Sequence, residues 1–120
     1  MANHSALISP GMMSLVATRS VPTLDTRLRV LAEPARAAIV RALAAEELCT
    51  CHLVELTGVR QTNVSNHLRV LREAGIVEAE PAGRFTYYRL RPEVLEELAD
   101  QLGQVAAMAR TAETTRRPCG

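Results

Sequence analysis

The chain has 120 residues, of which 48% are hydrophobic and 2% aromatic, and its formal net charge is +1. This length predicts a single domain, and this composition excludes a disordered chain and favours an aliphatic, helical core. An odd count of three cysteines argues against a secreted disulfide framework, and no apolar run approaches the length of a membrane span. We therefore expect a cytoplasmic protein without membrane contact, since the N-terminus also lacks the features of a signal peptide.

The predicted domain begins after an N-terminal arm. Residues 1–22 mix serine, glycine, methionine and two prolines with isolated apolar residues, and we interpret them as this arm. A globular domain is predicted over residues 23–110, followed by a loose tail over residues 111–120. Apolar residues at i, i+4 and i+7 predict a first helix over residues 23–31. Pro34 suits the first position of a second helix, where its missing N–H has no cost.

The middle of the chain has the pattern of a helix-turn-helix. Residues 46–48 are predicted to form a junction, and a short third helix is predicted over residues 51–56. Gly58 suits the left-handed position that ends this helix. A fourth helix opens at Gln61 or Thr62 and has an apolar inner stripe. A short helix, a turn with glycine and a longer helix together indicate a helix-turn-helix.

A hairpin and a last helix complete the predicted fold. Residues 76–80 and 85–90 are strand-like, and the segment 81–84 between them predicts a β-hairpin with a basic tip. A last helix begins at Pro92 or Glu93 and runs to about Ala109. The predicted fold is mainly α with a small β-hairpin, a winged helix-turn-helix of about five helices.

Charge is unevenly distributed along the chain. Between Arg60 and Arg91 six arginines accompany three glutamates, whereas between Pro92 and Thr115 five acidic residues accompany one arginine. A basic middle and an acidic C-terminal helix are typical of a protein with one DNA-facing side.

The predicted fourth helix has a polar outer face. A recognition helix offers donors and acceptors to base edges from such positions, where amides pair with adenine and arginine pairs with guanine. The candidate DNA-contacting residues on this helix are Gln61, Thr62, Asn63, Ser65, Asn66, His67 and Arg69. Arg84 at the hairpin tip is a further candidate, for a phosphate or minor-groove contact. The alternative is an ordinary solvated helix face, which the preceding turn and the charge distribution disfavour.

Two thiols lie at the predicted start of the third helix. Thiolates are the metal-binding form of cysteine, and a helix N-terminus favours an anion. Cys49 and Cys51 are placed to converge on one soft ion, which favours thiophilic species over Mg²⁺ or Ca²⁺. The alternative is that both are small, half-buried apolar residues.

The sequence resembles the ArsR/SmtB family of metal-responsive repressors over roughly residues 24–110. The segments that carry the resemblance are Leu28–Arg36, Glu47-Leu48-Cys49-Thr50-Cys51-His52-Leu53, Asn63-Val64-Ser65-Asn66-His67-Leu68-Arg69-Val70-Leu71, Ala74–Val77 and Gly83–Leu90. The resemblance implies a homodimer, paired through its first and last helices, that represses metal-detoxification operons. It also implies that the protein leaves double-stranded operator DNA when a metal or metalloid ion binds.

The resemblance further implies that Cys49 and Cys51 hold the inducer. Val54 stands where arsenic-sensing members commonly have a third cysteine, and the last helix has no histidine to match the zinc and nickel members. Cys119 in the tail is the candidate third sulfur ligand, with His4 and His52 as weaker candidates. We expect arsenite or antimonite as inducer, with cadmium or lead next, and no prosthetic group.

Other functional classes fit less well. The sequence has no glycine-rich phosphate loop, and its Cys-x-Cys spacing is not the redox Cys-x-x-Cys, so we expect no enzyme activity. A metal-free repressor that senses redox or persulfide species through the same thiols remains an alternative. In the favoured hypothesis, an ion that draws the two sulfurs together distorts the third helix and moves the reading helix after it.

Overall fold

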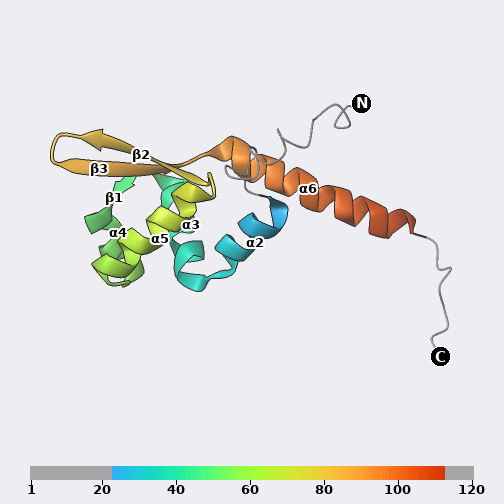
Figure 1. Ribbon diagram of the computed structural model, residues 1–120, viewed down its shortest axis with the longest axis horizontal. Coiled ribbons are helices and arrows are strands. Elements are labelled where there is room, and N and C mark those ends of the chain that lie inside the picture. Colours follow the sequence, from blue (N-terminus) through green and yellow to red (C-terminus); the bar gives the residue numbers. More distant parts are fainter. Residues whose placement is uncertain (1–22, 113–120) are drawn as a thin grey trace, which may run out of the picture.

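The computed structural model describes residues 23–112, which form five helices and a three-stranded antiparallel sheet (Figure 1). The helices are α2 (Leu24–Ala32), α3 (Pro34–Ala45), α4 (Thr50–Thr57), α5 (Gln61–Glu73) and α6 (Pro92–Thr111), and the strands are β1 (Leu48–Cys49), β2 (Val77–Ala82) and β3 (Phe85–Leu90). The predicted arm, His4, Cys119 and the tail from residue 113 onward lie outside the described residues. The predicted winged helix-turn-helix is confirmed.

Short local signals set the helix boundaries. Glu33 separates α2 from α3, and its carboxylate accepts hydrogen bonds from the backbone N–H of Ala35 at 2.7 Å and of Arg36 at 3.2 Å. Helix α4 ends at Gly58, whose φ of 74° is the left-handed conformation that glycine adopts without strain. The Gly58 N–H donates to the carbonyl of Val54 at 2.9 Å, which satisfies one of the last carbonyls of α4.

The core is aliphatic and lies where α3, α4 and α5 meet the start of the sheet. Its largest fully buried side chains are Ile39, Leu53, Val64, Leu68, Leu71 and Ile76. Three of them, Val64, Leu68 and Leu71, are the predicted inner stripe of α5. Complete burial of each such side chain stabilises the fold by about 1.5–3 kcal/mol. The inner face of α5 is therefore fixed, and its polar face must point outward.

The sheet has the order β1-β3-β2. Strand β1 was not predicted from the sequence. Leu48 was predicted to lie in a junction, but it pairs with Tyr88, and Cys49 pairs with Tyr87. Strands β2 and β3 form the predicted hairpin, joined by a tight turn at Gly83 (φ 65°) and Arg84. We call β2, β3 and this turn the wing, which projects at one end of the molecule in Figure 1.

Helix α6 extends from the other end of the fold (Figure 1). Buried Arg27 of α2 joins it to the end of α5, because Nε donates to the carbonyl of Ala74 at 3.3 Å and Nη1 lies 3.0 Å from Oε1 of Glu97. The helix runs two residues past its predicted end at Ala109. Neither α6 nor any other helix among residues 23–112 is long and apolar enough to cross a bilayer.

Candidate functional site

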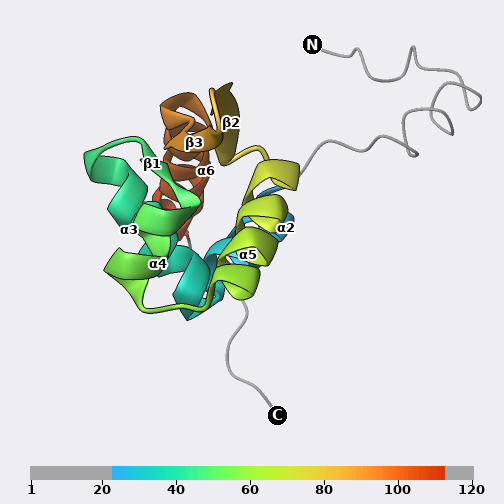
Figure 2. The same cartoon turned by 90° about the vertical axis from the view of Figure 1, so that its left-hand side faces the viewer.

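The outer face of α5 is exposed and polar. Burial of the opposite, aliphatic face turns this side of the helix outward, and Figure 2 shows α5 at the edge of the folded part of the chain. The exposed candidates for DNA contact are Gln61, Thr62, Asn63, Ser65, Asn66 and Arg69. The guanidinium of Arg69 donates to the side-chain oxygen of Asn66 and lies 3.5 Å from Glu73. These candidates therefore form one surface that offers both donors and acceptors.

His67 is placed differently from the other candidates. Its ring is half-buried, with Nδ1 3.3 Å from Nη1 of Arg36 and Nε2 3.9 Å from Oε1 of Glu33. The ring therefore contacts the start of α3 and does not belong to the outer surface of α5. The DNA contact expected for His67 from its position next to Asn66 stays a prediction.

The two thiols lie where the sheet passes into α4. Cys49 is both the last residue of β1 and the N-cap of α4, and its side chain makes no capping hydrogen bond. Only 5% of Cys49 is exposed, whereas Cys51 in the first turn of α4 is exposed. Both are free cysteines. Sγ of Cys49 lies 3.4 Å from Nδ1 of His52, so the structure places His52, a weaker candidate ligand in the sequence analysis, beside the buried thiol.

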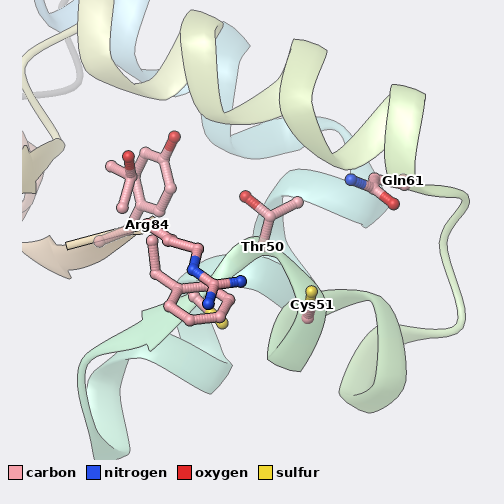
Figure 3. Close-up of a pocket in the computed structure, with 8 residues that line it drawn as sticks. Thr50, Cys51, Gln61 and Arg84 are labelled. Atoms are coloured by element: carbon pink, nitrogen blue, oxygen red, sulfur yellow. The ribbon is translucent and has the colours of Figure 1, made fainter. Parts of the chain in front are cut away.

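A cavity of about 260 Å³ opens at this junction. The residues that line it come from β1, α4, α5 and the wing, and are Cys49, Thr50, Cys51, Gln61, Arg84, Phe85, Thr86 and Tyr88. Figure 3 shows the side chain of Arg84 reaching from the wing toward Thr50 and the start of α4, with Gln61 at the start of the next helix. Both thiols therefore share one cavity with two of the candidate DNA contacts.

The donor set is small. Within residues 23–112 no group of three or more His, Cys, Asp or Glu side chains is arranged to hold a metal ion. The donors nearest the cavity are the sulfurs of Cys49 and Cys51, with the His52 nitrogen beside the first. Cys119, predicted as the third sulfur ligand, lies outside the described residues, so its role stays a prediction. Two sulfurs suit a thiophilic species better than a hard cation.

An ion-pair cluster joins the segment before β1 to the wing. Arg89 of β3 lies 2.7 Å from Glu78, 3.1 Å from Glu80 and 3.6 Å from Glu47. The hydrogen bond and the charge of Glu78 raise the pKa of the Arg89 guanidinium above its ordinary value. The chain that leads into Cys49 is thus held to the same sheet as the wing, both by this cluster and by strand pairing.

Comparisons with known proteins point to one group of regulators. Residues 33–79 match the family described as "Bacterial regulatory protein, arsR family". The chain is 40% identical over 77 residues to the "Arsenic resistance transcriptional regulator ArsR1" of Pseudomonas putida, a match that covers 63% of this chain and 60% of that protein. It is 33% identical over 99 residues to the "Transcriptional repressor SmtB homolog" of Synechocystis sp., covering 79% of this chain and 73% of that protein.

A solved structure agrees with these relatives. The crystal structure of a "Possible transcriptional regulator for arsenical resistance" superposes with a TM-score of 0.62 at 34% identity, over 73% of this chain and 98% of that chain. These relatives are named as regulators, which agrees with the expectation that the chain is not an enzyme. The chain spans less than two thirds of the length of the Pseudomonas putida relative.

Proposed function

Because the chain belongs to the ArsR family of bacterial regulatory proteins, we propose that it is a transcriptional repressor that binds operator DNA and leaves it when a thiophilic metal or metalloid binds Cys49 and Cys51. The observation that carries this proposal is the cavity at the start of α4, where both thiols open beside Gln61 of α5 and Arg84 of the wing. Donors for the ion and candidate contacts for DNA therefore meet at one place.

The DNA-binding part of the proposal is supported by the exposed polar face of α5. Its amide and hydroxyl groups suit base edges and phosphates in the major groove, as in other helix-turn-helix proteins. Arg84, at the tip of the wing, is positioned at the end of an extended hairpin and is exposed. A guanidinium there suits a phosphate or the minor groove flanking the major-groove site.

Arsenite is the inducer that the two thiols fit best. Two cysteine thiols replace two hydroxyls of As(OH)₃ with two As–S bonds and release two water molecules, so one hydroxyl remains on arsenic. Antimonite reacts in the same way. The Pseudomonas putida relative carries arsenic resistance in its name, which supports this choice. The remaining position can keep its hydroxyl or take a third protein donor, for which Cys119 and His52 are the candidates.

The mechanical part of the proposal follows from the place of Cys49. Cys49 is the buried N-cap residue of α4, and Cys51 is exposed in the first turn of this helix. We propose that bringing their sulfurs onto one ion changes that first turn. Helix α4 leads through Gly58 directly into α5. Coupling between two such sites is typically about 1–3 kcal/mol, or 5–150-fold in affinity.

The protein acts on DNA as a homodimer in this proposal. Leu102, Val105 and Met108 are large apolar residues that stay exposed on α6, and Leu28 of α2 is also exposed. These two helices are those through which the family pairs according to the resemblance described above. A second copy would cover this apolar surface and place two α5 helices at half-sites about 34–36 Å apart.

A cadmium or lead sensor is the second candidate. The contact between Nδ1 of His52 and Sγ of Cys49 supports it, because an imidazole nitrogen with two thiolates forms a mixed site that suits a borderline or soft divalent cation. Titration with Cd²⁺ and with arsenite, followed by thiolate charge-transfer absorbance under reducing conditions, separates the two inducers. A metal-free thiol sensor would respond to neither ion and would respond to an oxidant or a persulfide.

Replacement of Cys49 by serine tests the proposal. Fluorescence anisotropy with a DNA fragment from upstream of the coding sequence measures DNA affinity with and without arsenite. We expect the wild-type protein to lose about 5–150-fold in affinity when arsenite is added, and Cys49→Ser to bind DNA like wild type and to ignore arsenite.

A second variant, Cys119→Ser, tests the predicted third sulfur ligand, which lies outside the described residues. An unchanged arsenite response in Cys119→Ser leaves His52 or hydroxide as the third ligand, whereas a weaker response assigns that position to the tail. The proposal fails if the wild-type protein keeps its DNA affinity when its thiols are saturated with thiophilic ions.

A further inference from the structure

The cavity brings together residues that are far apart in the sequence. Gln61 is the first residue of α5 and Arg84 is the last residue of the wing turn, yet both line the cavity that holds the two thiols. Figure 3 shows Arg84 crossing the space between the wing and the start of α4. An occupant of the cavity therefore lies beside a cation that is also a candidate DNA contact.

We propose that Arg84 is the residue that couples the thiol site to DNA binding. When the cavity is empty, its guanidinium contacts a DNA phosphate. When Cys49 and Cys51 hold a metalloid, the guanidinium donates instead to the oxygen that remains on that metalloid, and the wing loses its DNA contact. This inference rests on the proposed function, and it names how occupancy of the thiol site is transmitted.

Arg84 has the freedom that such an exchange requires. It is exposed and forms no ion pair within residues 23–112, in contrast to Arg89 of β3, which contacts three glutamates. Its neighbour Gly83 has a φ of 65°, so the turn depends on a residue without a side chain. A guanidinium has five N–H donors in a planar fork, which can donate to phosphate oxygens or to the oxygen of a bound hydroxyl.

The chemistry of the inducer supplies the acceptor. Two thiols satisfy two of the three valences of As(III), and the hydroxyl left on arsenic has lone pairs that accept hydrogen bonds. Because Cys51 is exposed and Cys49 lines the same cavity, that hydroxyl falls in the space that Arg84 also lines. The exchange leaves the total charge of the protein unchanged, since the reaction of As(OH)₃ with two neutral thiols releases only water.

The wing is also closer to the thiols than the far end of α4 is. Helix α4 has eight residues, so the turn that leads to α5 begins about 12 Å along the helix from Cys49. Strand β3, by contrast, pairs with Cys49 directly through Tyr87, and Tyr88 lines the cavity. A change at the thiols therefore reaches the wing through one strand pairing, without passing along a helix.

Two arginine variants test this coupling. Arg84→Ala removes the residue that lines the cavity. Arg60→Ala is the control, because it also removes one positive charge. Arg60 is exposed, precedes α5 and does not line the cavity. We compare the ratio of DNA affinities without and with saturating arsenite. The expected ratio is about 5–150-fold in the wild-type protein and in Arg60→Ala. It should be several-fold smaller in Arg84→Ala, where only the path through α4 remains.

A second measurement needs no DNA. The whole chain contains one phenylalanine, two tyrosines and no tryptophan, and these three aromatic residues are Phe85, Tyr87 and Tyr88 of β3. Intrinsic tyrosine fluorescence therefore reports on the wing alone. Arsenite should change this emission in the wild-type protein and change it much less in Arg84→Ala, while As–S absorbance shows equal occupancy of the thiols in both.

The outcomes separate this inference from the proposed function. If arsenite does not release the wild-type protein, the proposed function fails. If it releases the wild-type protein and Arg84→Ala by the same factor, only the role of Arg84 is overturned. If both Arg60→Ala and Arg84→Ala lose the arsenite response, the role of Arg84 is also overturned, because a general effect of charge then explains the two variants. If Arg84→Ala binds DNA too weakly to measure, the tyrosine emission decides.

Discussion

The ionised carboxylate of Glu33 stabilises the N-terminus of helix α3. Its carboxylate accepts hydrogen bonds from two backbone N–H groups of α3 and lies near His67 and Arg36. Burial alone would raise the pKa of Glu33, but the hydrogen bonds from the Arg36 and Ala35 N–H groups and the nearby positive charges lower it below its ordinary value of 4.5. The ionised form is therefore favoured by folding.

This shift predicts a pH-dependent effect of Glu33→Gln. Because the pKa is lower in the folded state, the extra stability from the carboxylate is complete above about pH 4.5 and is lost as pH falls through the folded value. Urea unfolding of wild type and Glu33→Gln should show a stability difference at pH 7 that shrinks below pH 4.5. The control Glu46→Gln removes the same charge from an exposed residue at the other end of α3 and should cost less stability at pH 7 than Glu33→Gln. A difference that grows in acid would contradict the assignment.

At the scale of elements, a glycine that follows a helix and a glycine inside a helix should respond in opposite ways to substitution by alanine. Gly58 ends α4 with a φ of 74°, so Gly58→Ala forces a side chain into the left-handed region at a cost of about 1–2 kcal/mol. Gly103 lies inside α6 with open space around it, so Gly103→Ala should stabilise the protein by about 0.5–1 kcal/mol. Urea unfolding of both variants measures these changes. Equal signs would show that backbone conformation does not govern the two sites.

The sequence predicts the elements whose signals are local. The apolar period places α2, α3, α5 and α6 close to their observed bounds, because those helices bury one face and have a proline or glycine at an end. The two-residue strand β1 has no local signal. Leu48 and Cys49 become a strand only through pairing with Tyr88 and Tyr87, which lie almost forty residues later in the chain. Alternation cannot be recognised in so short a segment.

The sequence indicates the candidate residues of the site but not their arrangement. Cys49, Cys51, Gln61 and Arg84 all follow from residue type and motif, but their common cavity depends on how β1 places α4 beneath the wing. His67 is grouped by the sequence with the candidates of α5, but its ring lies 3.3 Å from Arg36 of α3. Tertiary contacts decide which side chains meet, and these contacts cannot be read from a single sequence.

At the scale of the whole molecule, the apolar surface of α6 predicts how the protein assembles. Val105 is 56% exposed among other large apolar residues of the helix, so Val105→Glu places a charge where a second copy would pack. We expect it to convert a dimer to a monomer in analytical ultracentrifugation and to lower DNA affinity strongly. Gln104→Glu adds the same charge to the neighbouring exposed position and should leave the dimer intact. A dimer that survives Val105→Glu places the interface elsewhere.

Arg27 has a consequence for the choice of target sites. By binding the carbonyl of Ala74 and the carboxylate of Glu97, it fastens the C-terminal end of α5 to α6. In a dimer built on α6, the distance and angle between the two recognition helices are then fixed by the rigid packing of α5 against α6. Promoters would be selected by the interval between their half-sites as strictly as by the bases within them.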